Sequence, residues 1–428
     1  MYAKYVFYSL MFLVSFAVGQ GALNENAYIK QFAFGAAFTA MTVVALVFPD
    51  RNKQTWIRIT WGDIFVLALL TVYLFFHAGT CNVPDFSLPF VCFLFYGFIR
   101  IQAGDDPAET VRILSRIVSA VMLLHVLCCA SQFFGMLPAF HGYFSAGGTF
   151  GNPDMSGAYL AVLSPFCYMN REWRIFKTVV LCLTVVLLLL MQARTALVAV
   201  AVAGTAYLLL SGQLSRKTFF RWALIPAMAV VAALVWWHPG SVAGRLFIWW
   251  IALNMLVSRP TGWGLYAFEK HYPEFQAEYV AGHDISAFFH PDAVHSPYNE
   301  FLNVGVTLGV GGLLPYLSFI VFVLIAAYRT RSPLLYPVCA FLVVSLSYFP
   351  FKIVPLAVVG IALSALIVGH CPVGRPATVG LKWKRWLLLA IIAPVAWLTW
   401  NSFRVYRQWQ EAVTDRQRKL FIQFINLI

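Results

Sequence analysis

Residues able to carry chemistry are concentrated in one polar stretch of the sequence, from Trp236 to Gly312. It separates two long apolar segments and contains Arg245 and Arg259. Five of the nine histidines also fall within it: His238, His271, His283, His290 and His295. Guanidinium groups bind oxyanions, and imidazoles exchange protons near neutral pH. We therefore expect a binding or catalytic site in this stretch.

Two arginines are placed where they could hold a diphosphate. Arg194 occurs in LLLLMQARTALVAV, where two apolar runs meet almost without a loop, and no carboxylate lies near it in the sequence. A guanidinium in such a place needs an anionic partner or a wet cavity, which favours an external anion. Arg245 opens GRLFIWWIALNML, with Trp249 and Trp250 one turn on to hold a sugar or a lipid neck. The alternatives are a snorkelling Arg194 and a solvated Arg245 in an aromatic belt.

His295 is the candidate base. It precedes Ser-Pro-Tyr-Asn-Glu at 296–300 and a glycine-rich run that leads into the next apolar segment. An imidazole can accept the proton of an attacking hydroxyl at neutral pH, and Glu300 or Asp292 would orient the ring. The alternative is a hydrogen-bonded structural histidine.

A metal site is a competing use of the same region. Its ligands would be drawn from His283, Asp284, His290, Asp292 and His295. None of these spacings matches a zinc signature such as HExxH, so the pattern disfavours metal binding.

Three further polar features have simpler interpretations. His125, inside an apolar segment, is predicted to be a satisfied interior residue, and Asp63 to mark the end of a span. Residues 147–154, GGTFGNPD, predict a turn and nothing more by themselves.

The elements that position these residues must be membrane helices. Of the 428 residues, 61% are hydrophobic and only 11% are charged, too apolar for a soluble core. The apolar runs are continuous rather than alternating, which favours helices over a barrel. The chain is thus predicted to be an all-α polytopic membrane protein. Thirteen spans are expected: 5–20, 31–48, 62–79, 87–101, 113–135, 156–169, 177–192, 195–211, 220–237, 302–327, 333–348, 352–369 and 386–400.

The basic residues predict the orientation of these spans. Nineteen lysines and arginines fall on the side that holds Lys4, and six on the other side before the tail. By the positive-inside rule, the N-terminus is cytoplasmic and the histidine-rich loop faces outward. The net charge of +13 is therefore explained by topology, and no nucleic-acid partner is expected. We expect a transmembrane domain over 1–400, with a catalytic loop at 238–301, and an outward amphipathic tail over 401–428 that could lead into a further domain.

Several motifs in this order resemble the bacterial O-antigen ligase and polymerase superfamily. They are GTFGNPD at 148–154, ART at 193–195, GRLFIWW at 244–250, RPTGWGLYAF at 259–268 and AVHSPYNEFL at 293–302. The chain departs from the family pattern in one place. Val306 stands where a glycine is expected eleven residues after the histidine, with Gly305 and Gly309 on either side. The outward tail is closer to relatives that glycosylate proteins or polymerise repeats than to lipopolysaccharide ligases.

The resemblance implies an inverting glycosyltransferase that works without a metal or other cofactor. Such enzymes are GT-C-like bundles of about 12–13 transmembrane helices in the bacterial inner membrane, with a large periplasmic loop. They transfer a glycan from undecaprenyl pyrophosphate to a hydroxyl of a glycan, lipid or protein acceptor. Carried onto this chain, Arg194 and Arg245 would hold the pyrophosphate and His295 would act as the base. Residues expected to contact substrate are Asn152, Trp249, Arg259, Tyr298 and Glu300. A lipid-linked sugar transporter remains the alternative from another class.

Overall fold

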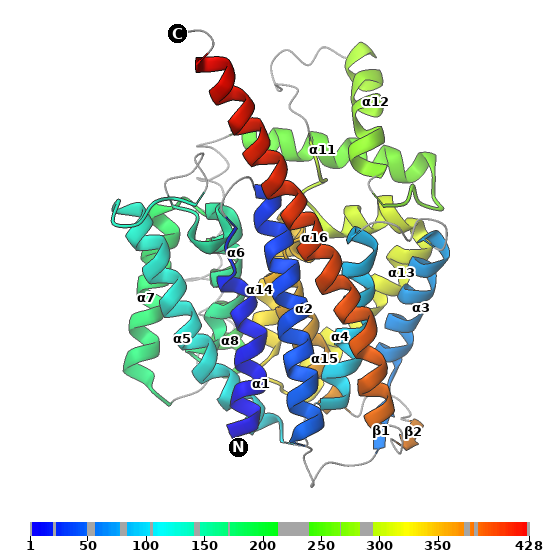
Figure 1. The fold of residues 1–428 in the computed structure, drawn as a ribbon. Helices are drawn as coiled ribbons and strands as arrows, with labels where there is room; N and C mark the ends of the chain where they lie inside the picture. Colours follow the sequence, from blue (N-terminus) through cyan, green and yellow to red (C-terminus); the bar gives the residue numbers. More distant parts are fainter. Residues whose placement is uncertain are drawn as a thin grey trace.

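The protein is almost entirely helical. The structure, a computed structural model, describes residues 2–425 except 20–22, 49–55, 78–83, 103–105, 141–145, 170–171, 213–238, 266, 283–293, 372–376 and 381–383. The helices of the first half are α1 (Tyr2–Leu13), α2 (Leu23–Val47), α3 (Trp61–His77), α4 (Pro84–Gln102), α5 (Pro107–Phe133), α6 (Pro153–Leu163), α7 (Arg174–Leu190) and α8 (Arg194–Leu210) (Figure 1). Those of the second half are α11 (Pro239–Ser258), α12 (Ala267–Gly282), α13 (Glu300–Arg329), α14 (Leu335–Ser347), α15 (Val354–His370) and α16 (Lys384–Ile425).

Short elements join these helices. They are the 3₁₀ turns η1 (Val14–Phe16), η2 (Gly148–Phe150), η3 (Ser164–Cys167) and η5 (Pro350–Lys352), and the strands β1 (Trp56–Ile59) and β2 (Ala377–Gly380). The two strands pair antiparallel, with Trp56 opposite Gly380. This four-residue pairing is the only departure from the predicted all-α class in the described part of the chain, and it fastens two loops at one end of the bundle.

The helices agree with the prediction of a helical membrane protein. In the described ranges, four are long and apolar enough to cross a membrane: Asn26–Val47, Pro107–Phe133, Glu300–Arg329 and Trp386–Ala412. Seven shorter helices are also apolar. Every predicted span except 220–237 falls on a described helix, and that one lies outside the described residues. Residues 401–425 continue α16 without interruption from the preceding span.

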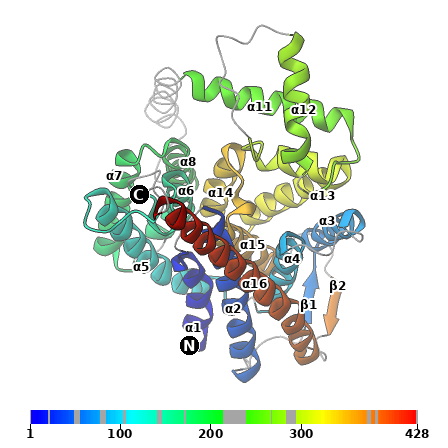
Figure 2. The same cartoon turned by 45° about the horizontal axis from the view of Figure 1, so that its top comes forward.

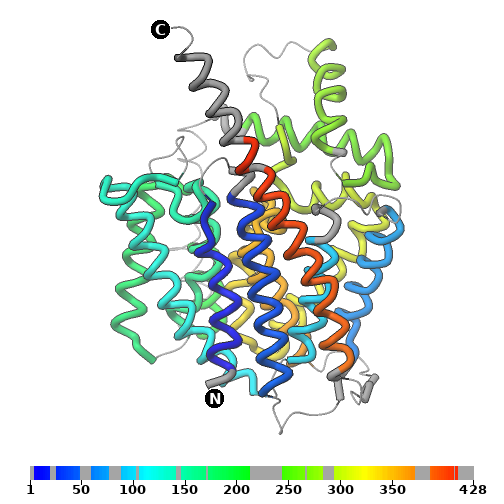
Figure 3. The backbone as a smooth tube through the Cα atoms, viewed as in Figure 1, coloured from blue at the N-terminus to red at the C-terminus, as the bar shows by residue number. Residues whose placement is uncertain are grey.

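Long-range packing builds one bundle around a buried central helix. In α15 most side chains between Val354 and Val368 are buried, because the helix is surrounded by α2, α4, α13 and α14. Around it, α16 packs along α2 (Figure 3), and the contacts also place α13 along α3 and α14 along α8. Sequence neighbours are therefore mostly not spatial neighbours, and residues far apart in the chain meet at the ends of the helices.

The two ends of the bundle differ. The N-terminus, β1 and β2 lie at one end, here called the strand end, whereas α11 and α12 lie at the other, here called the α11 end (Figure 1). In both views α11 lies across the bundle rather than along it (Figure 2). One face of α11 packs with α12 and α13 through Ile251, Ala252 and Met255. The other face exposes Leu246, Trp250 and Val257. The polar loop is thus held by its own small core.

A break in α13 anchors this loop to the bundle. Gly309 has φ 65° and ψ −167°, so the helix stops and restarts there. The two carbonyls freed by the break accept backbone N–H groups from the loop after α11: Trp263 donates to Val306 at 2.8 Å and Gly264 to Thr307 at 2.9 Å. The amide of Val310 donates to Pro260 at 2.8 Å. A buried helix break is tolerated because its polar groups are paired.

Candidate functional site

The GTFGNPD turn positions a carboxylate at the α11 end. The amides of Gly147 and Gly148 donate to the Gln132 side chain at 3.2 and 2.7 Å, which fixes the start of the turn. Asn152 then caps α6, its Oδ1 accepting from the amides of Asp154 at 2.8 Å and Met155 at 3.3 Å. Asn152, predicted to contact substrate, thus has its side-chain oxygen engaged in capping. The residue that the cap orients is Asp154, in the first turn of α6.

Asp154 brings the two predicted arginines together. Burial raises the pKa of the Asp154 carboxyl, and Arg245 and then Arg194 oppose that shift by their positive charges. Arg194 is the first residue of α8 and Arg245 lies in α11, so three separate helices supply the three groups. The Asp154 side chain is solvent-exposed although protein surrounds it closely enough to raise its pKa. Within the described residues, no ion pair or side-chain hydrogen bond joins Asp154 to either arginine.

The fold gives Arg194 an acidic neighbour that its local sequence does not provide. Arg194 lacks an acidic neighbour in the sequence, but the fold supplies one forty positions earlier. In the described ranges, one carboxylate faces two guanidinium groups, so these three side chains together carry an excess positive charge. Each guanidinium group presents paired N–H donors, and the one carboxylate cancels only one of the two positive charges. Such a group can bind an anion that carries more than one negative charge.

An aromatic wall lies next to these charges. Tyr348 follows α14 and interacts electrostatically with Asp154, Tyr298 and Arg245. Its ring stacks on Phe349 with 4.5 Å between centroids, and Tyr298 lies 5.7 Å from Phe349 and 6.4 Å from Tyr348. The predicted residue Tyr298 therefore lies beside the arginine group. The wall, Tyr298, Tyr348 and Phe349, leads from the arginines to the histidine loop.

The histidine loop is fastened at both ends. Asn299 caps α13 by accepting from the amides of Phe301 and Leu302, and its Nδ2 donates to the Leu346 carbonyl at 3.1 Å. His295 itself is exposed, and its carbonyl accepts a hydrogen bond from Lys352 Nζ at 3.3 Å. The described contacts leave the imidazole without a hydrogen-bond partner. His295 is therefore accessible at the far edge of the aromatic wall.

Glu300 does not orient His295 in this structure. Its side chain is buried, with 2% exposed. One carboxylate oxygen accepts from Asn303 Nδ2 at 3.1 Å and the other from the Phe351 amide at 3.5 Å. Glu300 thus links the start of α13 to η5 from the interior. The other proposed orienting residue, Asp292, lies outside the described residues.

Trp249 lies on α11, and Arg259 directly follows its last residue. Arg259 is exposed just after α11, with its guanidinium carbon 5.4 Å from the Trp263 ring. Fourteen residues of helix separate it from Arg245, about 21 Å at the usual rise, so the structure does not bring Arg259 into the arginine group. Trp249 lies one turn beyond Arg245, and its buried indole Nε1 has no described hydrogen-bond partner.

The metal alternative falls mostly outside the described residues. His283, Asp284, His290 and Asp292 lie there, as does His238. Among the residues that are described, no three histidine, cysteine or acidic side chains gather as metal ligands would. His271 contacts Glu274, with Nδ1 3.1 Å from the carboxylate, away from His295.

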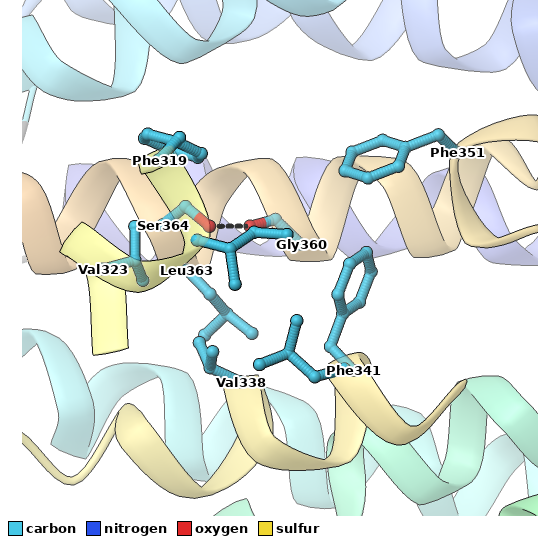
Figure 4. A pocket seen from close by; sticks show the side chains of 10 residues that line it. Phe319, Val323, Val338, Phe341, Phe351, Gly360, Leu363 and Ser364 are labelled. Carbon is cyan, nitrogen blue, oxygen red and sulfur yellow. Dashed lines mark hydrogen bonds between the residues drawn. The ribbon is translucent and has the colours of Figure 1, made fainter. Parts of the chain in front are cut away.

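An apolar cavity lies deeper in the bundle, between α13, α14 and α15 (Figure 4). Phe319, Val338, Phe341 and Leu363 contribute to its lining, and Ser364 donates its hydroxyl to the Gly360 carbonyl at 2.8 Å. No ionisable side chain lines it. The cavity offers room for hydrocarbon but no group for acid, base or anion chemistry, so it is not the candidate site.

Comparisons with family models and with curated proteins identify no relative of this chain. No protein-family model matches the chain, and no curated protein matches it. The site must therefore be judged by its own residues: two arginines, one carboxylate, an aromatic wall and an accessible histidine.

Proposed function

We propose that this chain is a membrane glycosyltransferase of the O-antigen ligase and polymerase type. It would take a glycan from undecaprenyl pyrophosphate and transfer it to a hydroxyl acceptor at the periplasmic face of the bacterial inner membrane. The observation that carries the proposal is the unequal charge group at the α11 end, where, among the described residues, Arg245 and Arg194 both act electrostatically on the Asp154 carboxylate. A GT-C-like architecture and a periplasmic loop at 238–301 are part of this proposal.

The donor would bind through its diphosphate. Two guanidinium groups from separate helices can each present paired N–H donors to phosphate oxygens, which one ammonium group cannot do. Because the arginines belong to α8 and α11, binding would also hold the cross-lying α11 against the bundle. The exposed apolar face of α11 would then meet the lipid end of the donor.

The transfer step is a displacement at the anomeric carbon. The acceptor hydroxyl oxygen forms a bond to that carbon while the bond from the carbon to the phosphate oxygen breaks, and its electron pair stays on the lipid diphosphate. The hydroxyl proton passes to the His295 imidazole. The arginines stabilise the negative charge that grows on the leaving diphosphate, which lowers the barrier most where the charge changes most. Attack opposite the leaving group inverts the anomeric centre.

The aromatic wall would hold the sugar being transferred. Tyr298 and Phe349 are only partly buried, and both rings lie beside Tyr348, which interacts electrostatically with Arg245. Aromatic faces pack against the apolar faces of sugar rings. The order along the site, diphosphate clamp, aromatic wall and base, matches the order of groups in a lipid-linked glycan meeting an acceptor. Lipid A core oligosaccharide, a growing polysaccharide and a protein Ser or Thr all provide such an acceptor.

The decisive experiment measures transfer with purified protein. The full chain, in detergent, is incubated with lipid-linked oligosaccharide and each acceptor class in turn. We expect Arg245→Gln and Arg194→Gln to reduce kcat/KM at least about 100-fold, as loss of one donor to a developing oxyanion does. Arg245→Lys should also be poor, because it loses the fork. His295→Ala should abolish transfer while donor binding is kept.

A matched control separates the site from general damage. Arg112 is exposed near the start of α5, at the strand end, and Arg112→Gln should leave transfer unchanged. Full transfer by the His295→Ala variant would remove the imidazole from the mechanism. Transfer that persists when both arginines are replaced would refute the proposal.

A lipid-linked sugar transporter is the second candidate, and the break in α13 favours it. Interrupted helices with free backbone groups often bind substrates in transporters. Here the carbonyls of Val306 and Thr307 are already occupied by amides of Trp263 and Gly264. The break therefore serves to anchor the loop. Movement of a fluorescent lipid-linked sugar across proteoliposomes that contain only this protein, without glycan transfer, would favour the transporter.

A further inference from the structure

We propose that Lys352 is a third cationic contact for the diphosphate of the donor. The inference rests on the proposed function and concerns the same site. Loss of the Lys352 charge should be compensated by neutralising Asp154, because both changes alter the net charge of the same site.

The two arginines alone do not balance the expected ligand. Arg194 and Arg245 each carry a positive charge, and ionised Asp154 cancels one of them. A diphosphate that joins a lipid to a sugar carries roughly two negative charges, and the released lipid diphosphate gains another near neutral pH, since a terminal phosphate has a second pKa of about 6. A further cation is therefore needed, most of all in the product-like transition state.

Lys352 lies where that cation is needed. It ends η5, between α14 and α15, and its side chain is exposed. Its Nζ donates to the His295 carbonyl at 3.3 Å and lies 6.0 Å from the Phe349 ring. Phe349 in turn stacks on Tyr348, which interacts electrostatically with Asp154 and Arg245. The ammonium group thus lies next to the proposed base and borders the aromatic wall at Phe349.

The ammonium group is free to take an anion. Among the described residues Lys352 forms no ion pair. The carboxylate that acts on it electrostatically, Glu300, is buried and already accepts from Asn303 and the Phe351 amide. An ammonium has three donors, so the single bond to the His295 carbonyl leaves two for a phosphate oxygen. Lysine is also rare on this side of the predicted membrane, which argues against a role in topology.

The rival explanation is that Lys352 only fastens the His295 backbone. Two substitutions separate charge from fastening. Lys352→Gln keeps a donor for the His295 carbonyl but removes the charge, whereas Lys352→Arg keeps the charge. The soluble probe is a short prenyl diphosphate. It is titrated into the full chain in detergent, and its dissociation constant is measured by isothermal titration calorimetry. We expect Lys352→Gln to weaken binding roughly tenfold and Lys352→Arg to stay within about threefold of wild type.

A double variant gives the sharper readout. Asp154→Asn combined with Lys352→Gln restores the original net charge of the site, so binding should return to within about threefold of wild type. A fastening role predicts instead that Lys352→Gln binds as wild type does, since glutamine keeps the donor, and that the double variant binds about as tightly as Asp154→Asn alone. Lys270→Gln, an exposed lysine on α12, is the matched control and should bind as wild type does.

The outcomes separate this inference from the proposed function. If wild type binds the probe, Arg245→Gln loses binding and Lys352→Gln binds as wild type, the role of Lys352 is overturned while the proposed function stands. Failure of the double variant to recover also overturns it. If wild type itself does not bind, the proposed function fails and this inference fails with it. Weak binding by Lys352→Gln, rescued by Asp154→Asn, supports both.

Discussion

The two ends of the bundle each hold an aspartate with arginine, yet in opposite states. At the strand end, Asp63 accepts from Arg100 Nε and Nη2, both at 2.8 Å, and from Tyr96 at 2.9 Å. The amide and hydroxyl of Thr60 complete its shell at 2.8 and 3.0 Å. The Arg100 side chain is only 5% exposed. The charges of Asp63 and Arg100 are therefore matched within the fold.

At the α11 end the charges are unequal and open. Asp154 is exposed and faces two guanidinium groups without forming a described ion pair. A closed pair such as Asp63 and Arg100 contributes to the structure, because a ligand could bind only by breaking it. An open group with surplus charge contributes little to stability but can bind an anion. If the proposed function is right, pairing rather than residue type separates a structural arginine such as Arg100 from a binding one such as Arg194.

The largest expected effect tests the closed pair. Arg100→Gln leaves the partly buried Asp63 with an unmatched charge, and breaking a pair whose arginine is buried typically costs about 3–5 kcal/mol. We expect a much lower thermal unfolding midpoint in detergent. Arg194→Gln should lower the midpoint far less, because Arg194 forms no described ion pair. Equal losses of stability in the two variants would abolish the distinction between the ends.

The sequence predicted the helices well because each one is a local feature. An apolar run of the right length identifies a span wherever it packs, and all predicted spans in the described ranges fall on helices. His125 is likewise confirmed as a satisfied interior residue, buried with its Nε2 2.8 Å from Ser15 Oγ. Asp63 does begin the third of these helices, but its ion pair with Arg100 depends on packing between two helices.

The site was predicted only in part, because its completion is non-local. Arg194, Arg245 and His295 could be singled out from their types and positions. Asp154 was hidden in a turn motif, and nothing in the local sequence tells that α6 brings it to two other helices. Tyr348 and Lys352 were missed because they follow an ordinary apolar span. An acidic residue within the GNPD turn and a lysine on the lysine-poor side were the available signals.

The break in α13 shows the same limit. The glycine-rich run after His295 predicted the start of a membrane span. The structure instead has an interruption within the helix. A Cβ at Gly309 would lie 2.4 Å from the Pro260 carbonyl oxygen, and one at Gly262 would lie 2.5 Å from the Gly309 nitrogen. The two glycines are needed because two backbones distant in sequence touch there. Val306, which departs from the family pattern, is fully buried beside this contact.

A smaller effect is expected from neutralising the open carboxylate. Asp154→Asn keeps the shape of the residue and removes the charge that cancels one arginine. We expect the prenyl diphosphate probe to bind roughly tenfold more tightly, since one unfavourable charge near the ligand is removed. The matched change at the strand end, Asp63→Asn, should lower stability without tightening binding. Weaker binding by Asp154→Asn would mean that Asp154 serves mainly to orient the arginines.

The smallest effect concerns the pH dependence of donor binding. The charges that face Asp154 are Arg194 from α8 and Arg245 from α11, with Tyr348 beside them after α14. Burial raises the pKa of the Asp154 carboxyl, so it takes up a proton at a higher pH than an ordinary aspartate, for which the pKa is about 3.9. As the pH falls toward that raised pKa, the carboxylate loses its charge and the arginines become more available to the diphosphate.

The terminal phosphate of the probe also takes up a proton at a pKa of about 6, which weakens binding to every variant alike. We therefore expect the affinity of wild type for the prenyl diphosphate to rise relative to that of Asp154→Asn as the pH falls toward the raised pKa of Asp154. Asp154→Asn should remove this component, and His295→Gln should be compared with it because an imidazole titrates in the same interval. A pH dependence that survives in Asp154→Asn but disappears in His295→Gln would assign the effect to the histidine. In that case the carboxylate at the α11 end would stay ionised throughout, as the paired one at the strand end is expected to do.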